Sequence, residues 1–460
     1  MDINQYQSYF FIGIGGTGMS AIAQYLKGIG KSVSGSDRQF NSIAKTEIEE
    51  KLNNEGILTF EQNGNGINDQ TDIVVVSTAV ENNNPEYQKA VELELSIVHR
   101  ADLLAAITET KYTIAVSGTS GKSTTTAMIY HIMEKLGLPI SFIGGAGLIS
   151  LQKMGKIGNA IATKSDWLVI EADESDGSLV KYKPEIGIIL NIDKDHKELE
   201  ELDTIFNTFS KNIKAKLIVN QSNSRAKLFS QRLNNDFGYE VPCGFNITAF
   251  KQNGFHISFK INQVEFEIPC IGRHNAENAA AAAIACYNLG FLLDKSAEAL
   301  KSYEGIYRRH QLIGKVNGMT IIDDYAHNPA KMAASIKACQ FEGRKLYVWF
   351  QPHGYQPTKF LRNEFVEEIS SSLRQEDEIW MSEIYYAGGS VVKDISSKDL
   401  IDDIKKSHKK AFYIENRESF PESIKSKIES GDIVLLTGAR DPSLSDFAKF
   451  VYNRLSTLIG

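Results

Sequence analysis

The sequence predicts an α/β protein of three domains whose sheets are mostly parallel. Its 460 residues are enough for about three domains of ordinary size. Apolar strands, turns and helices alternate along the chain, which is typical of strand–helix–strand units in parallel sheets. The run 72–77 consists mostly of valine and isoleucine, as expected of a strand that is buried on both faces.

Composition and charge exclude several classes of protein. Hydrophobic residues at 42% and charged residues at 23% are ordinary for a globular protein, which excludes a disordered or low-complexity chain. The formal net charge of −7 argues against a broad basic face for nucleic acid, but it allows a local pocket for an anion. The four cysteines lack zinc-binding spacing and are interpreted as core residues. We find no signal peptide and no apolar run of the ~18 residues that a membrane span needs, so we expect a soluble, cytoplasmic protein.

The first predicted domain, residues 1–107, opens with a glycine-rich turn between a strand and a helix. Gly13, Gly15 and Gly18 form a GxGxxG pattern, and the acidic residue Asp37 follows the next strand. This is the dinucleotide-binding fingerprint of a Rossmann-like domain, in which the glycines let the backbone approach a diphosphate at the helix N-terminus. The alternative is a tight turn without a ligand, and the pattern leaves open which molecule carries the diphosphate. The elements expected here are strands at 9–14, 32–35 and 72–77 and a helix at 19–28.

The second predicted domain, residues 108–314, contains a more informative glycine-rich turn. In a phosphate loop, backbone N–H groups surround the phosphates, a lysine reaches the outer phosphates and a hydroxyl binds Mg²⁺. The turn is shorter than the full GxxxxGK[ST] pattern, but its position between a strand and a helix predicts ATP or GTP binding and a mostly parallel P-loop domain. The residues concerned are Gly118, Thr119, Ser120, Gly121, Lys122, Ser123 and Thr124.

Acidic residues follow two further predicted strands of this domain, in the segments 171–176 and 191–196. Ligands gather at the carboxyl ends of parallel strands, and carboxylates beside a phosphate loop coordinate magnesium. We therefore expect Mg²⁺ near Ser123, and Glu174 with His196 could bind a second metal ion. The alternatives are an exposed acidic turn and a structural histidine.

The remainder of the chain continues the α/β pattern. Between about residues 215 and 270 the strands are shorter, which indicates a more antiparallel region. The third predicted domain, residues 315–460, is again Rossmann-like, and its charge run 405–410 is interpreted as the solvated face of a helix. The expected elements are strands at 112–116, 167–170, 186–190, 255–261, 264–268, 319–322, 346–350, 378–380 and 433–436, and helices from 124 and at 276–289.

Taken together, these motifs resemble those of the Mur ligases, ADP-forming enzymes that add amino acids to the UDP-sugar precursor of bacterial peptidoglycan. The resemblance covers all 460 residues in order. Within the family, the first glycine turn and the motif Phe350-Gln351-Pro352-His353 are most similar to the branch that joins L-alanine to UDP-N-acetylmuramate. The segments that carry the resemblance are 13–20, 34–37, 99–101, 118–125, 171–176, Asn191 with His196, 272–278, Arg308-Arg309 and 323–329.

The resemblance implies a role for each matching residue. Lys122, Glu174, His196 and His327 would be the catalytic residues. The first glycine turn would hold the uridine diphosphate of the UDP-sugar, and not a nicotinamide cofactor, through Gly15, Gly16, Thr17, Gly18, Met19, Ser36 and Asp37. The other implied contacts are 118–124 with the ATP phosphates; Ser123, Glu174 and His196 with Mg²⁺; Asn275 and Asn278 with adenine; Arg309 and Asp324 with the nucleotide; and His327 and His353 with the incoming amino acid.

The chain departs from this branch where the acceptor amino acid would bind. By the resemblance, a histidine is usual at the position of Ser120, and arginines that hold the acceptor carboxylate are usual at the positions of Gly354 and Pro357. Because neither of the last two side chains can donate a hydrogen bond, either another cation replaces the arginines or the acceptor differs from L-alanine. The candidates are Lys359, Arg362 and Arg440. Arg440 follows a strand at the carboxyl edge of its sheet, where ligands gather; the alternative is a surface ion pair with Asp441.

The predicted function is therefore that of an ATP-dependent, ADP-forming amide ligase of peptidoglycan synthesis, which joins L-alanine to UDP-N-acetylmuramate with Mg²⁺ as cofactor. The substrate carboxylate would attack the γ-phosphate to give an acyl phosphate, and an amine would then displace phosphate. The alternatives are a sister ligase that attaches a tripeptide or another amino acid, a nicotinamide-dependent oxidoreductase, and an inactive paralogue. The oxidoreductase leaves the phosphate loop unexplained. We expect a monomer or homodimer that acts on small molecules, without nucleic acid or membrane insertion.

Overall fold

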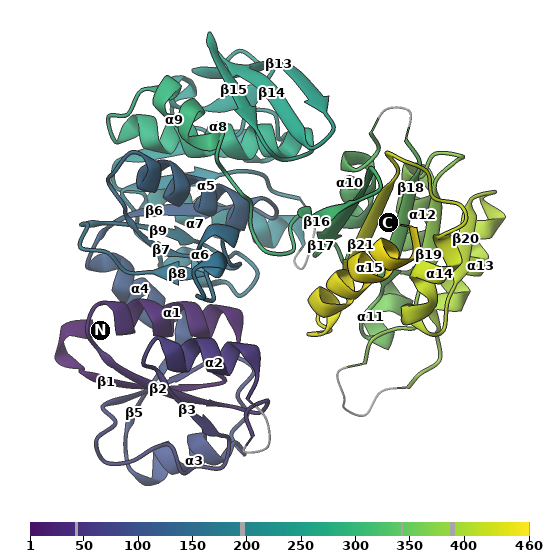
Figure 1. Ribbon diagram of the computed structural model, residues 1–460. Helices are drawn as coiled ribbons and strands as arrows, with labels where there is room; N and C mark the ends of the chain where they lie inside the picture. Colours follow the sequence, from purple (N-terminus) through teal and green to yellow (C-terminus); the bar gives the residue numbers. More distant parts are fainter. Residues whose placement is uncertain (42–44, 194–197, 342–343, 387–391, 460) are drawn as a thin grey trace. The chain divides into compact units, whose positions relative to one another are not determined.

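The computed structural model describes residues 1–41, 45–193, 198–341, 344–386 and 392–459, which form two compact units (Figure 1). The first unit consists of Met1–Lys251, Ile257–Pro269 and His274–Ile306, and the second of Gln252–His256, Cys270–Arg273 and Tyr307–Gly460. Among the described residues, three of the four sheets are wholly or mostly parallel, so the predicted α/β fold class is confirmed. No helix in this part of the chain is long and apolar enough to cross a membrane.

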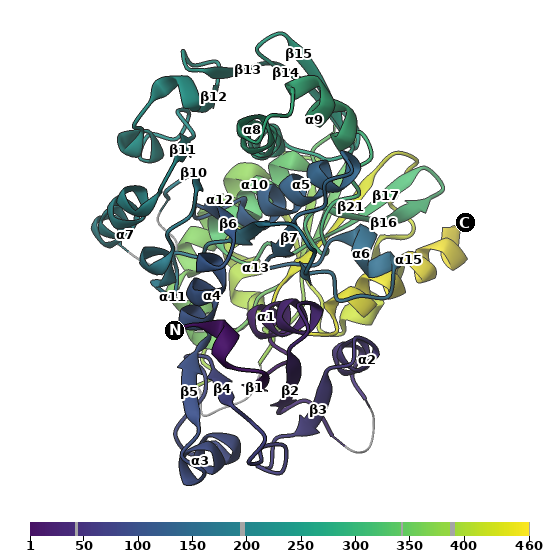
Figure 2. The ribbon, with the colours of Figure 1, turned by 90° about the vertical axis from the view of Figure 1, so that its left-hand side faces the viewer.

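The first sheet has five parallel strands in the order β3-β2-β1-β4-β5, which Figure 2 shows side by side. Its elements are β1 (Ser8–Ile12), β2 (Ser32–Asp37), β3 (Leu58–Glu61), β4 (Ile73–Val76), β5 (Ser96–His99), α1 (Thr17–Gly28), α2 (Glu47–Asn54), α3 (Pro85–Glu92) and α4 (Arg100–Glu109). The sequence predicts β1, β2 and β4, but not β3 and β5, which lie at the edges, contain no fully buried residue and lack a continuous apolar run. From β1 the chain adds β2 and β3 on one side of the sheet and then β4 and β5 on the other side, so the strand order switches between β1 and β4. Open α/β sheets bind ligands at such a switch point.

The second sheet has six strands in the order β11-β10-β6-β9-β7-β8 and is parallel except for β8. The elements of this region are β6 (Tyr112–Ser117), β7 (Ser141–Ile143), β8 (Ala160–Ile161), β9 (Trp167–Glu171), β10 (Ile186–Ile189), β11 (Lys216–Val219), α5 (Lys122–Lys135), α6 (Ile149–Lys153), α7 (Leu199–Asn212), α8 (Arg273–Asn288) and α9 (Leu293–Leu300). Helix α5 begins two residues earlier than predicted because Gly121, at φ +87°, turns the chain into the helix at once.

A four-stranded sheet covers the region that the sequence predicts to be more antiparallel. Its strands are β12 (Phe237–Tyr239), β13 (Phe245–Asn253), β14 (His256–Ile261) and β15 (Val264–Ile268). Strands β14 and β15 form an antiparallel hairpin, as expected, whereas β12 and β13 pair in parallel.

One hydrophobic core joins the first two sheets. Phe11 of β1 and Ile22 of α1 belong to the same buried cluster as Ala115 of β6 and Leu168 of β9. Helix α4 spans the predicted boundary at residue 107, and the three predicted domain ranges stay predictions. Because the core is continuous, the glycine-rich turns of both sheets belong to one compact unit.

The second unit contains a six-stranded sheet in the order β16-β17-β21-β18-β19-β20, with helices on both faces (Figure 1). Its elements are β16 (Gln311–Val316), β17 (Met319–Asp324), β18 (Leu346–Gln351), β19 (Glu378–Met381), β20 (Lys410–Tyr413), β21 (Ile433–Gly438), α10 (Pro329–Ala338), α11 (Tyr355–Phe360), α12 (Arg362–Ser372), α13 (Ser397–Lys406), α14 (Phe420–Ile424) and α15 (Leu444–Ile459). Val348 and Phe350 of β18 pack in the core with α10, α12 and α13, while Tyr347 and Trp349 pack with α14 and α15.

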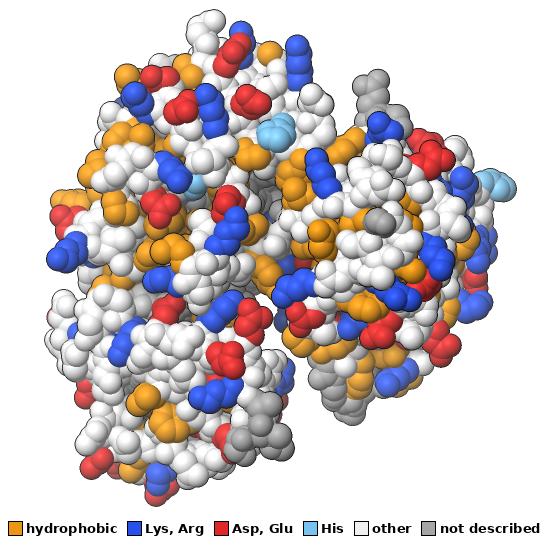
Figure 3. Space-filling model, in the orientation of Figure 1, with side chains coloured by type: hydrophobic (Ala, Val, Ile, Leu, Met, Phe, Trp, Pro, Cys, Tyr) orange, Lys and Arg blue, Asp and Glu red, His pale blue; other side chains and the backbone are white. Residues whose placement is uncertain are grey.

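Two sequence-based interpretations of this unit need correction. The edge strands β16 and β20 are not among the predicted strands, because both are partly exposed. Helix α13 ends at Lys406, and Lys410 begins β20, so the run 405–410 is not one helix face. Its side chains are largely exposed, as predicted. On the face shown in Figure 3, basic and acidic side chains are intermingled over both units.

Candidate active site

The phosphate loop connects the central strand β6 to α5, at the carboxyl edge of the second sheet. Gly118 and Gly121 adopt φ angles of +134° and +87°, which residues with a Cβ rarely adopt. A Cβ on Gly118 would also lie 3.0 Å from the backbone nitrogen of Asn191. The glycines are therefore required by the path of the chain and leave N–H groups at the start of α5, where phosphates bind.

Asn191, two residues after the end of β10, holds the phosphate loop in shape. Its side-chain Oδ1 accepts hydrogen bonds from the Thr119 hydroxyl and the Ser120 N–H, both at 2.8 Å. Its Nδ2 donates to the carbonyl of Ser120 at 3.0 Å. From the sequence, Asn191 is recognised only as a motif residue, because a contact between residues 71 positions apart leaves no local signal.

Lys122 and Glu174 form a buried ion pair at this loop. The Lys122 Nζ donates to Glu174 Oε2 and to the carbonyl of Gly118, each at 2.7 Å, and lies 3.4 Å from Asp173 Oδ1. Burial lowers the pKa of Lys122, but the nearby carboxylates outweigh this effect and raise it, so the ammonium stays charged. Burial raises the pKa of Glu174, against the effect of Lys122. The loop thus holds a desolvated cation beside an acceptor that a phosphate can replace.

The predicted adenine residues lie next to the same loop. Asn275 and Asn278 belong to the first turns of α8, and their side chains are 7% and 5% exposed. Asn278 Nδ2 donates to Asn275 Oδ1 at 3.1 Å, and a Cβ on Gly121 would lie only 2.4 Å from Asn278 Oδ1. The structure therefore brings the phosphate loop, Glu174 and both asparagines together in the first unit.

Two of the three predicted Mg²⁺ ligands, Ser123 and Glu174, lie in the described part of the chain. Ser123 and Glu174 supply a hydroxyl and a carboxylate, the hard oxygen donors that Mg²⁺ prefers when phosphates complete its shell. His196, the third predicted ligand, lies outside the described residues. Within the described ranges no group of three or more His, Cys, Asp or Glu side chains is arranged to hold a metal ion.

The first glycine turn is stabilised by its own acid. Asp37 Oδ2 accepts the N–H of Gly15 at 3.0 Å, and the N–H of Gly16 donates to the carbonyl of Gly13 at 3.1 Å. The sequence assigns Asp37 to a ribose hydroxyl and Gly15 to the diphosphate, but in this structure the two residues bind each other. The N–H groups of the first turn of α1, from Thr17 to Met19, have no partner within the helix and stay available to an anion.

Arg100 is a cation beside this turn, and no role for it is predicted from the sequence. Its guanidinium forms an ion pair with Asp176 at 2.5 Å, and a Cβ on Gly18 would lie 3.0 Å from its Nη1. Asp176 ends the acidic segment that contains Glu174. Arg100 thus places a positive charge next to the N-terminus of α1, which favours an anion there.

The second unit brings together the residues predicted to meet the amino acid. The rings of His327 and His353 are 5.5 Å apart. The Nδ1 of His327 donates to the carbonyl of Tyr325 at 2.9 Å, which leaves Nε2 as the acceptor of the neutral ring. The Nδ1 of His353 is buried without a hydrogen-bond partner among the described residues. Burial lowers the pKa of His353, and the charge of Arg440 lowers it further.

The three candidate cations for the acceptor differ in their partners. Asp441 pairs with Arg417 at 2.8 Å, so the alternative of an ion pair between Arg440 and Asp441 is not found. Lys359 pairs with Asp394, and Arg362 pairs with Asp403 at 2.7 Å. Within the described part of the chain Arg440 has no ion-pair partner, so its charge is available to a ligand.

Arg309 and Asp324, the predicted nucleotide residues of the second unit, flank the same edge. Asp324 ends β17, is 6% exposed and accepts the N–H of His310 at 3.0 Å. The guanidinium of Arg309 lies 5.4 Å from the ring centroid of Tyr325. Burial acts to raise the pKa of Asp324, but His310 and Arg309 outweigh it and hold that pKa below its usual value.

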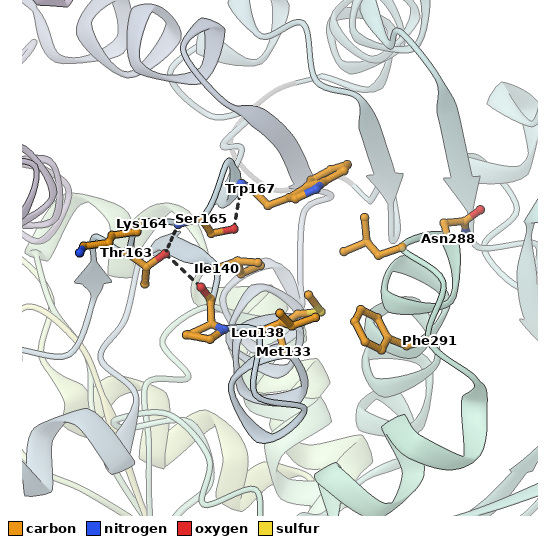
Figure 4. A pocket seen from close by; sticks show the side chains of 11 residues that line it. Met133, Leu138, Ile140, Thr163, Lys164, Ser165, Trp167, Asn288 and Phe291 are labelled. Atoms are coloured by element: carbon orange, nitrogen blue, oxygen red, sulfur yellow. Dashed lines mark hydrogen bonds between the residues drawn. The ribbon is translucent and has the colours of Figure 1, made fainter.

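A pocket of about 620 Å³ lies elsewhere in the first unit (Figure 4). Its walls include Met133 and Leu138 at the C-terminal end of α5, Trp167 at the start of β9, and Leu289 and Phe291 after α8. The phosphate loop and the two asparagines lie at the opposite ends of α5 and α8. This apolar pocket is therefore separate from the candidate nucleotide site.

Acidification is expected to destabilise the protein through His327. Burial lowers the pKa of His327 from 6.5 to about 4, so the unfolded chain takes up this proton at a higher pH than the folded chain. The stability that the neutral ring contributes is complete above pH 6.5 and is lost as the pH falls toward 4. Between about pH 7 and about pH 4 the free energy of unfolding should fall in both proteins. Measured by urea unfolding, we expect this fall to be about 2 kcal/mol smaller in His327→Asn than in the wild type. Equal losses in the two proteins would contradict this shift.

The chain matches known proteins along most of its length. Residues 8–112 match the catalytic domain of the Mur ligase family, residues 116–286 its middle domain and residues 308–440 its glutamate ligase domain. Two similar relatives are UDP-N-acetylmuramate–L-alanine ligases: that of Carboxydothermus hydrogenoformans, 33% identical over 93% of each chain, and that of Geotalea uraniireducens, 34% identical over 93% of this chain and 94% of the relative. The solved UDP-N-acetylmuramate-alanine ligase of Thermotoga maritima has a TM-score of 0.80 at 25% identity and covers 98% of this chain and 99% of its own. A murein peptide ligase of Psychrobacter arcticus shares the fold with a TM-score of 0.65 at 19% identity, covering 99% of this chain and all of its own.

Proposed function

Because this chain belongs to the Mur ligase family of ATP-dependent acid–amino-acid ligases, we propose that it joins L-alanine to UDP-N-acetylmuramate. The observation that carries the proposal is the presence of two glycine-rich turns in one compact unit, each at the start of a helix, where free N–H groups favour an anion. Relatives that cover 93% of the chain and carry the L-alanine ligase name support this choice of substrates.

The phosphate loop suits ATP. In the proposed complex, the phosphates lie at the start of α5 and replace Glu174 as the partner of Lys122. Glu174 and Ser123 then become available, with His196 as a predicted third ligand, to hold Mg²⁺, which would supply further positive charge at the phosphates. Asn275 and Asn278 offer amide donors and acceptors to the edge of the adenine base.

The first glycine turn suits the diphosphate of the sugar nucleotide. The N–H groups at the start of α1 and the guanidinium of Arg100 both favour an anion at this position. Because Arg100 also contacts Asp176, the UDP-sugar would bind beside the acidic segment of the ATP site. A nicotinamide cofactor would leave this neighbouring ATP site without a role.

The proposed reaction has two steps. A carboxylate oxygen of UDP-N-acetylmuramate attacks the γ-phosphorus of ATP, the bond to the bridging oxygen breaks and ADP leaves. The amine of the acceptor then attacks the acyl carbon, and inorganic phosphate leaves as the amide forms. The amine attacks as the free base after its ammonium form has lost a proton to solvent, and the neutral Nε2 of His327 is suited to accept a hydrogen bond from it.

A sister ligase that attaches a peptide is the second candidate. Gly354 and Pro357 supply no side-chain donor where the resemblance leads us to expect arginines for the acceptor carboxylate. ADP release measured with UDP-N-acetylmuramate and a panel of amines distinguishes the candidates. Saturation by L-alanine at sub-millimolar levels supports the L-alanine ligase, whereas activity only with a tripeptide supports the sister enzyme. No activity with any amine, in the presence of both nucleotides, would contradict both.

Arg440 is proposed as the cation that holds the acceptor carboxylate. We expect Arg440→Ala to raise the KM for the amine about tenfold or more and to leave the KM values for ATP and UDP-N-acetylmuramate nearly unchanged. Arg454→Ala is the matched control, because its guanidinium is paired with Glu422 and it is not a candidate for the acceptor. Unchanged amine kinetics in Arg440→Ala would contradict the assignment and direct attention to Lys359 and Arg362.

A further inference from the structure

A buried polar contact joins the first glycine turn to the second sheet. Asn159, directly before β8, donates its side-chain N–H groups to the carbonyl of Thr17 at 2.8 Å and to the hydroxyl of Ser20 at 3.1 Å. Its side-chain oxygen accepts a hydrogen bond from Gln24 at 2.7 Å. Thr17, Ser20 and Gln24 lie on successive turns of α1, so one asparagine holds the first half of that helix.

This contact is sealed from solvent. Asn159 is 1% exposed, Gln24 3% and Ser20 0%. The three hydrogen bonds occupy both N–H groups and the oxygen of the Asn159 amide, so little hydrogen-bonding capacity is lost on its burial. Apolar side chains in this space would allow α1 to shift along the second sheet and still pack. A buried amide whose hydrogen bonds are all made fits only one position of the helix.

The far end of α1 is held by the same strand. A Cβ on Gly28 would lie 2.7 Å from the Cβ of Ala162, the residue after β8, so the helix backbone approaches the strand as closely as glycine allows. The helix that carries the proposed diphosphate-binding turn is thus fixed to the second sheet at both ends.

The backbone around Asn159 continues to the acidic end of β9. The carbonyl of Asn159 accepts the N–H of Gly144 at 2.8 Å, and the next residue, Gly145, donates its N–H to Glu171 Oε2 at 2.8 Å. A Cβ on Gly145 would lie 2.6 Å from that Oε2, so the approach requires glycine. Glu171 begins the acidic segment that contains Glu174. Asn159 therefore contacts the first glycine turn on one side. On the other side it is linked through Gly144 and Gly145 to the acidic segment beside the phosphate loop.

We propose that Asn159 is a positioning residue that holds the first glycine turn, the proposed UDP-sugar site, at the correct distance from the phosphate loop. The proposal rests on the proposed function, since it takes α1 to bind the sugar nucleotide and α5 to bind ATP. Asn159 contacts neither substrate and acts through α1. An error of about 1 Å in the placement of two reacting groups can cost about 100-fold in rate, so the alignment of α1 matters to the transfer of the phosphoryl group.

Three variants test this role. Asn159→Ala removes all three side-chain hydrogen bonds, and Asn159→Asp keeps the size of the side chain but replaces its donors by an acceptor. We expect both to lower kcat about 10- to 100-fold and to weaken binding of UDP-N-acetylmuramate about tenfold, while ATP binding, measured by calorimetry without the sugar nucleotide, changes less than about twofold. Ser20→Ala removes one hydrogen bond and leaves the amide in place; we expect about a threefold change in the same direction.

Lys181→Ala is the matched control. Lys181 forms an ion pair with Asp102 of α4 and so links the same two regions of the unit without contacting α1. It should leave kcat and both affinities near the wild-type values. Wild-type kinetics and UDP-sugar binding in the Asn159 and Ser20 variants, with only a lower melting temperature, would overturn the positioning role. If the wild type itself does not bind UDP-N-acetylmuramate, the proposed function fails and this proposal fails with it.

Discussion

Lys122→Ala is expected to lower the rate of ADP release about 1,000-fold or more, because it removes the cation closest to the transferring phosphoryl group. The structure adds a second effect. Glu174 is 3% exposed and would lose its ion-pair partner, so the variant should also be less stable by about 3 kcal/mol. ADP release and urea unfolding measured on the same preparation give both quantities.

A double variant separates lost catalysis from lost folding. In Lys122→Ala/Glu174→Gln the unpaired carboxylate is neutral, so most of the stability should return while the activity stays low. Lys153→Ala, which breaks only the exposed ion pair with Glu304, should change neither quantity. A purified Lys122→Ala protein that keeps a tenth of the wild-type ADP release would contradict the assignment of this loop.

Gly15→Val should weaken binding of UDP-N-acetylmuramate about 100-fold and leave ATP affinity nearly unchanged. A Cβ on Gly15 would lie 2.9 Å from Asp37 Oδ2, so the valine must push away the carboxylate that shapes the turn. The N–H groups at the start of α1 then lose the position in which they face the diphosphate. Calorimetry with each nucleotide measures both affinities in the same protein.

ATP binding is the internal control for this variant, because α5 and its loop lie on a different sheet. Loss of both affinities would show a general folding defect, which thermal unfolding would reveal. Tight binding of NAD by the wild type, without binding of the UDP-sugar, would contradict the account of the first turn.

The sequence predicts most of the buried strands and both glycine turns because their signals are local, but it misses the short buried strands β7 and β11. Buried parallel strands need continuous apolar runs, and a backbone that wraps a phosphate needs glycines at fixed spacing. The edge strands β3, β5, β16 and β20 carry no such run, since one side of each meets solvent. Their absence from the prediction follows from this exposure.

The contacts that organise the site are not local and could not be predicted. Asn159 and Ser20 are 139 positions apart, and Arg100 and Asp176 are 76 apart. Lys122 and Glu174 are each identified from the sequence, but their ion pair across 52 positions is visible only in the fold. The same holds for Asp37, which the pattern assigns to a ribose and the structure joins to Gly15.

Transfer of a labelled oxygen tests the central claim most directly. UDP-N-acetylmuramate with ¹⁸O in its carboxylate is incubated with ATP, Mg²⁺ and the amine that supports activity, and the released phosphate is analysed by mass spectrometry. If the carboxylate attacks the γ-phosphorus and the amine then displaces phosphate, each phosphate formed carries one carboxylate oxygen, and the amide product retains the other. Phosphate without the label, released together with the amide product, would contradict an acyl phosphate and with it the chemistry proposed for the two turns.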